Sequence, residues 1–226
     1  MNILIIGPSW VGDSVMAQTL YKRLKEESPE CKIDVISPEW SSGLMQRMPE
    51  VSKTIKSPYL HGDLKIFSRR HFGKNLKKSN YDQSIVLTNS LKSSLVPFFA
   101  KIPIRTGWLG EMRYGLLNDI RYLDKNKNHL MVEKFAALSI KDSNYSLENL
   151  SFPKLSIDFE NQQSTLVKFG INQDLPSLAI CPGAEFGPSK KWPEDNYSTV
   201  AKNYLKKGWN VLCFGSANDH ETGKKI

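Results

Sequence analysis

Ile180-Cys-Pro-Gly-Ala-Glu-Phe-Gly-Pro-Ser-Lys-Lys-Trp-Pro193 joins a short apolar run to an amphipathic segment, and this junction indicates the fold class. The apolar run stops at Pro182, and Pro193 stands where the following helix is expected to have its first turn. A strand, a glycine-bearing loop and a helix in this order are typical of an α/β protein with a parallel sheet. The loop also carries Lys190 and Lys191, and a cationic loop before a helix start favours phosphate binding.

A second unit of the same kind opens the chain, but its loop carries an acid instead of lysines. Residues 2–7 predict a buried strand, and residues 12–28 predict a helix with apolar side chains at helical spacing. Gly7 and Gly12 lack the spacing of the dinucleotide fingerprint, which disfavours a nicotinamide cofactor. Asp13 is a candidate general base for a sugar hydroxyl. The alternative is that this acid only caps the helix.

Composition describes an ordinary globular protein with a basic surface. The chain has 226 residues, 40% hydrophobic and 24% charged, with a formal net charge of +8. This charge favours anionic partners, but the chain has no arginine-rich tail or basic repeat, so nucleic acid is disfavoured. The three cysteines have no metal-ligand spacing and are expected to be small buried hydrophobes in a reducing compartment: Cys31, Cys181 and Cys213.

The chain is expected to be cytoplasmic. Met1 leads directly into a short apolar run that lacks the charged start and the length of a signal peptide. The longest apolar region is interrupted by Pro97, Lys101 and Pro103, so no segment is expected to span a bilayer.

Alternation of strands and helices predicts βαβ units in two domains. Residues 1–150 form the first domain, and a basic helix within it, over residues 61–79, is weakened by Gly73. Residues 151–163 are polar, include Pro153 and predict an interdomain connection. Residues 164–226 form the second domain. They supply two strands, fewer than a parallel domain needs, so this domain is expected to be truncated.

Several polar residues near the predicted strand ends are candidate ligands, each with a simpler alternative. Lys190 and Lys191 could stabilise a departing diphosphate, with Glu185 and Ser189 beside them, or be ordinary solvated charges. His220 and Glu221 could bind sugar hydroxyls or merely open the last helix. No cluster has metal-ligand spacing, so no metal is assigned. A basic set could face an anionic lipid surface or be a solvated face. It comprises Lys65, Arg69, Arg70, Lys74, Lys77, Lys78, Arg105, Arg113 and Arg121, with Phe67, Phe72, Phe98 and Phe99 nearby.

Four segments of the chain carry a combined signal: residues 5–13, followed by Met16 and Gln18, and then residues 105–119, 182–193 and 214–221. Together these segments resemble the heptosyltransferases of glycosyltransferase family 9. They stand in the family's order and span nearly the whole chain. The resemblance implies a GT-B architecture, in which two Rossmann-like domains face each other across a cleft. The acceptor then belongs to the first domain and ADP-heptose to the second, whose family counterpart extends beyond Ile226.

The resemblance also implies an activity: inverting, metal-independent transfer of heptose from ADP-L-glycero-D-manno-heptose to the lipopolysaccharide inner core, without a cofactor. The match is best to members that add the second heptose, to heptosyl-Kdo-lipid A. Alternatives are a first or later heptose transfer, or a catalytically silent fragment or binding module. Asp13 matches the family's base, Lys190 its donor-phosphate lysine and Glu221 an acid at the donor. Ser9, Trp10 and Gly12 match the acceptor loop, and the basic helix would face phosphorylated lipid A at the inner face of the inner membrane.

Overall fold

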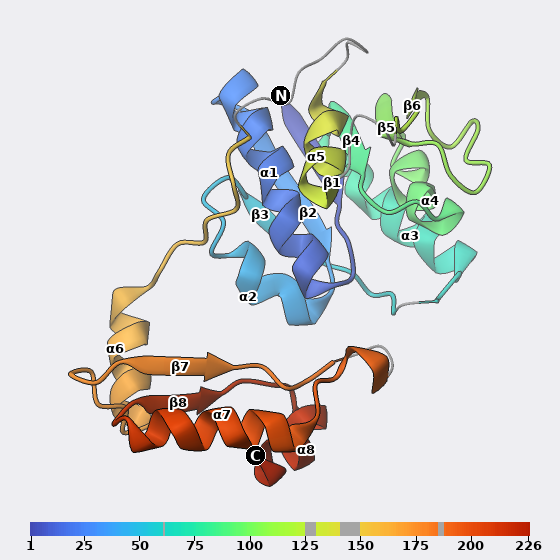
Figure 1. Ribbon diagram of the computed structural model, residues 1–226. Coiled ribbons are helices and arrows are strands. Elements are labelled where there is room, and N and C mark those ends of the chain that lie inside the picture. The colour runs from blue at the N-terminus through green and yellow to red at the C-terminus, as the bar shows by residue number, and fades with distance from the viewer. Residues whose placement is uncertain (61, 125–129, 141–149, 185–187) are drawn as a thin grey trace. The chain divides into compact units, whose positions relative to one another are not determined.

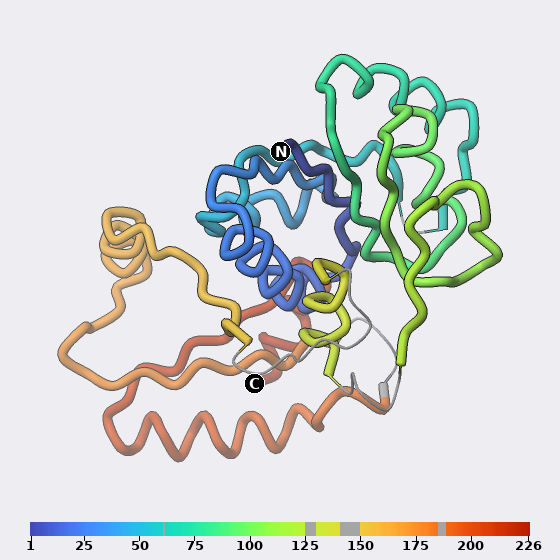
Figure 2. Tube along the Cα trace, turned by 90° about the horizontal axis from the view of Figure 1, so that it is seen from above, coloured from blue at the N-terminus to red at the C-terminus, as the bar shows by residue number. Residues whose placement is uncertain are grey.

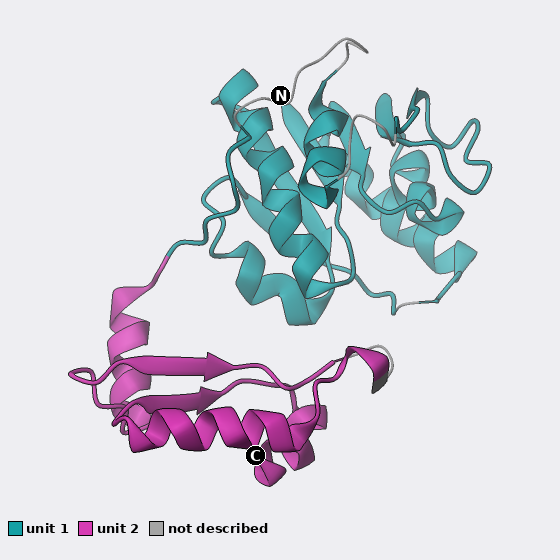
Figure 3. Ribbon diagram, in the orientation of Figure 1, with its two compact units in different colours: residues 1–156 teal, residues 157–226 magenta. Residues whose placement is uncertain are grey.

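The computed structural model describes residues 1–60, 62–124, 130–140, 150–184 and 188–226 (Figure 1). These residues form two compact units, Met1–Ser156 and Ile157–Ile226 (Figure 3). Each unit carries a parallel sheet with helices packed on it, which confirms the predicted α/β class. Every helix in the described ranges is too short or too polar to span a bilayer.

The first unit is built on a six-stranded parallel sheet with the order β3-β2-β1-β4-β5-β6. The strands are β1 (Asn2–Ile6), β2 (Lys32–Ser37), β3 (Lys53–Lys56), β4 (Gln83–Val86), β5 (Ile104–Trp108) and β6 (Asp119–Arg121). The order runs outward in one direction from β1 to β3 and in the other from β4 to β6. This Rossmann-like order places a topological switch point between β1 and β4, where open α/β sheets bind ligands.

Helices cover both faces of this sheet. α1 (Val11–Glu27) and α5 (Met131–Ala136) pack together on one face, as Figures 1 and 2 show. α3 (Ile66–Leu76) and α4 (Leu91–Phe99) pack together on the other, and the short α2 (Ser42–Met45) follows β2. Brief 3-10 turns lie at Glu39–Ser41, Lys77–Ser79 and Ala137–Ser139.

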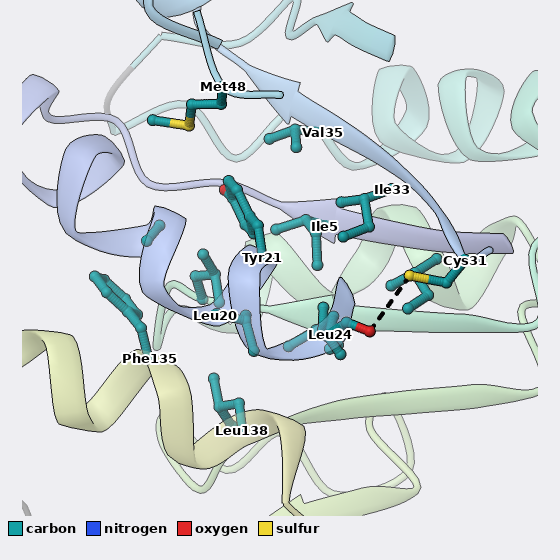
Figure 4. Close-up of a cluster of buried hydrophobic side chains, with 14 of the residues drawn as sticks. Ile5, Leu20, Tyr21, Leu24, Cys31, Ile33, Val35, Met48, Phe135 and Leu138 are labelled. Carbon is teal, nitrogen blue, oxygen red and sulfur yellow. Dashed lines mark hydrogen bonds between the residues drawn. The ribbon is translucent and has the colours of Figure 1, made fainter. Parts of the chain in front are cut away.

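The core consists of two apolar layers, one on each face of the sheet. Ile3 and Ile5 of β1 pack in the layer beneath α1 and α5, whereas Leu4 and Ile6 pack in the layer beneath α3 and α4. Figure 4 shows Ile5 in the first of these layers, close to Leu20 and Tyr21 of α1. A strand whose successive side chains are all buried requires cover on both faces, which explains the continuous apolar run at residues 3–6. Cys31 is buried in the first layer, as predicted, and donates its thiol to Leu24 O at 3.6 Å.

The second unit contains two parallel strands, β7 (Ser177–Ile180) and β8 (Asn210–Cys213), with α6 (Phe159–Lys168), α7 (Glu194–Lys206) and α8 (His220–Lys225). The expectation that Cys181 and Cys213 are buried is wrong: both thiols are exposed, because they stand at the carboxyl ends of the two strands. Pro193 is the N-cap of α7 and not a first-turn residue, so the helix begins one residue later than predicted.

The polar segment predicted as an interdomain connection is divided between the two units. Gln18 of α1 is fully buried; its amide donates to Lys154 O at 3.0 Å, and its carbonyl oxygen accepts the Lys154 N–H at 2.8 Å. Lys22 donates to Phe152 O at 2.6 Å. These bonds fasten residues 151–156 to the first unit, and α6 begins three residues after the boundary.

Candidate active site

A cavity of about 620 Å³ lies at the carboxyl edge of the first sheet, at the switch point between β1 and β4. Loops after five strands, β1 to β5, line it. Residues far apart in sequence meet there because parallel strands end at one edge. Lining residues include 7–10, 37–38 and 88–92, with Asp13, Tyr59, Leu60, Leu64, Arg69 and Glu111. We refer to this hollow as the Asp13 cavity.

Asp13 is placed in the cavity by the first turn of α1. The N-cap of this helix is Trp10, which is extended and forms no side-chain cap. The Asp13 carboxylate accepts no hydrogen bond from any described residue, so it does not act as a cap through its side chain. Burial raises the pKa of the Asp13 carboxyl above its ordinary value. A carboxylate with a raised pKa is a stronger proton acceptor than an ordinary aspartate, which suits a general base.

A second carboxylate, Glu111, lines the same cavity but is already engaged. Its Oε2 accepts the Leu91 N–H at 2.7 Å and thereby caps the start of α4. Glu111 and Met112 both have left-handed backbone conformations, with φ of 43° and 48°, which places the acid beneath α4 at a cost in backbone strain. Asp13 is therefore the acid available for proton transfer among the described lining residues. Glu111 lies inside a matching segment, but the sequence did not single it out.

Three of the predicted acceptor-side residues join Asp13 in this cavity: Ser9, Trp10 and Arg69. Arg69 is buried, contrary to the picture of an exposed basic face. Its guanidinium donates from Nε to Leu64 O at 2.7 Å and from Nη2 to Asp63 O at 2.8 Å, and it lies 4.0 Å from the centre of the Tyr59 ring. Gly12 is adjacent in α1, with no atom within 4 Å of the position that a Cβ would occupy.

Other members of the predicted basic set do not reach this cavity. Arg113 is fully buried and donates from Nη1 to Thr88 O at 2.6 Å and from Nη2 to Trp108 O. The expectation that it faces a lipid acceptor is wrong, because its buried guanidinium donates hydrogen bonds to backbone carbonyls and so holds the loop after β5 in place. Arg70 and Lys74 are exposed and line a different cavity.

In the second unit, Ser189, Lys190 and Lys191 are exposed at the 3-10 turn Pro188–Lys190 before α7. Glu185, predicted to contact the donor, lies outside the described residues. The positive charge of Lys191 reaches the adjoining strand-end loop, since it contributes to lowering the pKa of Asp219. The main cause of that lowered pKa is hydrogen bonding from Ser216.

Asp219 joins the two strand-end loops of the second unit. Its Oδ2 accepts the Ser216 N–H at 2.8 Å and the Ser216 hydroxyl at 2.7 Å. A Cβ on Gly183 would lie 2.5 Å from the same carboxylate, so only glycine allows this approach. A hollow of about 340 Å³ beside these loops is lined by Asp219 and His220. The Ser-x-x-Asp spacing of a capping box could have revealed Asp219.

Glu221 pairs with Lys224 at 2.8 Å on the exposed side of α8 and does not line the 340 Å³ hollow. Across the described ranges, no three His, Cys, Asp or Glu side chains gather where they could hold a metal ion.

Comparison with known proteins gives a consistent result. Residues 69–226 match glycosyltransferase family 9 (heptosyltransferase). The chain is 47% identical to lipopolysaccharide heptosyltransferase 2 of Escherichia coli K12 over all of its own length and 66% of the relative's. It is 45% identical to lipooligosaccharide heptosyltransferase 2 of Haemophilus influenzae, covering 67% of that protein. The solved structure of E. coli ADP-heptose LPS heptosyltransferase II superposes with a TM-score of 0.91 at 45% identity, over 100% of this chain and 67% of that one.

Proposed function

This chain belongs to glycosyltransferase family 9, the heptosyltransferases, and we propose that it transfers heptose from ADP-heptose to the inner core of lipopolysaccharide. The matched relatives named heptosyltransferase 2 favour the second heptose addition over the first. The observation that carries the proposal is Asp13: an acid without a hydrogen-bond partner among the described residues, lining a cavity at the switch point of the first sheet. The chain spans 66% of the length of the E. coli relative.

The proposed reaction is a single displacement that inverts the sugar centre. An acceptor hydroxyl in the Asp13 cavity attacks the anomeric carbon of the donor while its proton moves to the Asp13 carboxylate. The bond from that carbon to the diphosphate oxygen breaks, and ADP leaves with the electron pair. Ser9, Trp10 and Arg69 would position the acceptor, since they line the same cavity.

We assign the donor to the second unit. Its strand-end loops carry Lys190 and Lys191 beside the start of α7, and ammonium groups there would neutralise the charge that develops on the leaving diphosphate. Because protein cations supply this stabilisation, the reaction is proposed to be metal-independent. The acceptor is lipid-linked, so the protein would work at the inner face of the inner membrane as a peripheral protein.

The test is ADP release by the protein incubated with ADP-heptose and core acceptors that carry zero, one or two heptoses. We expect turnover with the one-heptose acceptor. Asp13→Asn should reduce the rate by about 10²–10⁴-fold, the usual contribution of a general base, while ADP binding measured by calorimetry persists. Glu160→Gln removes an exposed first-turn acid of α6 and serves as the matched control with a normal rate.

Stability measurements separate a catalytic role of Asp13 from a structural one. Burial raises the folded-state pKa of Asp13, so its ionised form disfavours folding once the pH has risen through that value. Asp13→Asn should therefore be at least as stable as the wild type at neutral pH. Near-normal turnover in Asp13→Asn would refute its role as the base, and unchanged ADP affinity in Lys190→Ala would refute the donor assignment.

A further inference from the structure

A second hollow in the first unit is lined by cations and aromatic rings, and the proposed transfer reaction does not use it. It has a volume of about 490 Å³, and we refer to it as the α3–α4 cavity. Its side-chain walls come from both helices and from the segment that leads into β5: Arg70, Lys74, Phe98, Phe99, Lys101 and Arg105. Because Lys101 and Arg105 precede or begin β5, this cavity lies toward the amino edge of the sheet, opposite the Asp13 cavity.

The close packing of α3 on α4 creates this cavity. A Cβ on Gly73 would lie 2.6 Å from Val96 O and 2.9 Å from the Phe99 Cβ, so the helices approach at a distance that only glycine permits. Arg70 and Lys74, one helical turn apart, flank this contact and are both exposed. Gly73, predicted from the sequence to weaken the helix, is thus the residue that brings two cations against the aromatic end of α4.

The cations of the cavity have no acidic partners. No ion pair among the described residues involves any of its four basic side chains, and no carboxylate lines it. Arg105 is held in place by neutral groups: Nε donates to Leu116 O at 2.6 Å and Nη1 to Ile102 O at 2.6 Å. These carbonyls orient the guanidinium without cancelling its charge, so the cavity keeps a positive potential.

We propose that the α3–α4 cavity binds the phosphate of an anionic membrane lipid and so anchors the protein to the bilayer surface. Charge complementarity identifies the ligand, because four unpaired cations suit a phosphate that carries a net negative charge. The aromatic wall identifies its source: Phe98 is 40% exposed and lies 5.8 Å from the Arg105 guanidinium, a pairing of apolar ring and cation that fits the lipid interface better than water. Lys77 and Lys78 continue the exposed basic surface beyond α3.

The test is co-sedimentation of the protein with vesicles of phosphatidylcholine alone or mixed with phosphatidylglycerol. The assay contains no ADP-heptose and measures no turnover. The lipid-binding proposal can therefore fail while the proposed transferase function holds, and the transferase function can fail while lipid binding holds. We expect binding only to the mixed vesicles. Arg70→Gln combined with Lys74→Gln should weaken it about 25-fold, since each interfacial cation contributes about fivefold. Both side chains are exposed and form no ion pair with described residues, so the variant should fold normally.

Lys202→Gln combined with Lys206→Gln is the charge-matched control, because it removes two exposed lysines one turn apart on α7. Binding of this control should change little. If the two double variants lost vesicle binding equally, the vesicles would be attracting the total charge of the protein and not this cavity, and the proposal would be overturned. Equal binding to neutral vesicles would also overturn the proposal. Release of the protein from the vesicles by millimolar inorganic phosphate would overturn it too, because the cavity would then bind free phosphate.

Discussion

Replacing Gly73 by alanine measures how tightly the α3–α4 contact is built. The added methyl group would meet Val96 O at 2.6 Å and the Phe99 Cβ at 2.9 Å, both of which belong to or adjoin the α4 backbone and cannot rotate away. Overpacking of this kind costs about 1–3 kcal/mol. Alanine regains about 1 kcal/mol of helix propensity, so the net destabilisation should reach up to about 2 kcal/mol.

Gly12→Ala is the matched control for the same chemical change in another helix. No atom lies within 4 Å of its Cβ position, so alanine meets open space and should stabilise the protein by up to about 1 kcal/mol. Urea denaturation of the two variants should therefore give shifts in midpoint of opposite sign at unchanged m-values. If the open space above Gly12 receives the acceptor, Gly12→Ala should also raise the acceptor KM.

A Gly73→Ala variant as stable as Gly12→Ala would refute the reasoning, because the two helices would then separate without cost. Vesicle binding gives an independent check. Displacing α4 should move Phe98 away from Arg70 and Lys74, so Gly73→Ala should also bind anionic vesicles more weakly, whereas Gly12→Ala should not.

Three further results are expected. The kcat/KM of transfer should fall roughly tenfold per pH unit below the pKa of Asp13, which burial raises, so the loss should begin at a higher pH than for an ordinary aspartate. Arg113→Met should lower the free energy of unfolding by about 2 kcal/mol or more in urea, because the buried Trp108 O and the half-buried Thr88 O each lose a charged donor. Tyr81→Phe should cost about 1.5–3 kcal/mol by losing the 2.6 Å bond to Asp34, whereas Tyr21→Phe should cost nothing in the same assay, since its buried hydroxyl has no described partner.

The elements that the sequence predicted well are those that local pattern determines. β1 ends one residue before the predicted bound, and α1 differs by one residue at each end, because the apolar pattern marks both elements. β6 was missed because Asp119–Arg121 is short and polar; it is a strand only through its pairing with β5. Pairing of this kind depends on the three-dimensional arrangement and leaves no periodic signal in three residues.

The candidate site shows the same division between local and tertiary information. The position of Asp13 on the loop after the first strand was enough to single it out as a candidate, and the structure places it in the cavity at the switch point. The basic residues were grouped by charge, and charge alone does not reveal burial. Helix geometry offers part of the missing signal: Arg69 lies on the face that includes buried Gly73, four residues later, whereas Arg70 and Lys74 lie together on another. Nothing local marks Arg113, because its burial arises from the fold of the loop after β5.

The Asp13 cavity and the α3–α4 cavity are linked by a single rigid element, α3, and this link has a mechanical consequence. Arg69 lines the Asp13 cavity and Lys74 lines the α3–α4 cavity, five residues apart on α3 and hence roughly 7.5 Å apart along its axis. Gly73 locks this helix on α4. If lipid phosphate occupies the second cavity, α3 fixes how far the reacting hydroxyl stands from the bilayer. A lipid-linked acceptor would then be presented to Asp13 at a fixed distance from the bilayer. Replacing Arg70 and Lys74 should therefore raise the KM for lipid-linked acceptor in vesicles. The kcat and the KM for a delipidated acceptor should not change.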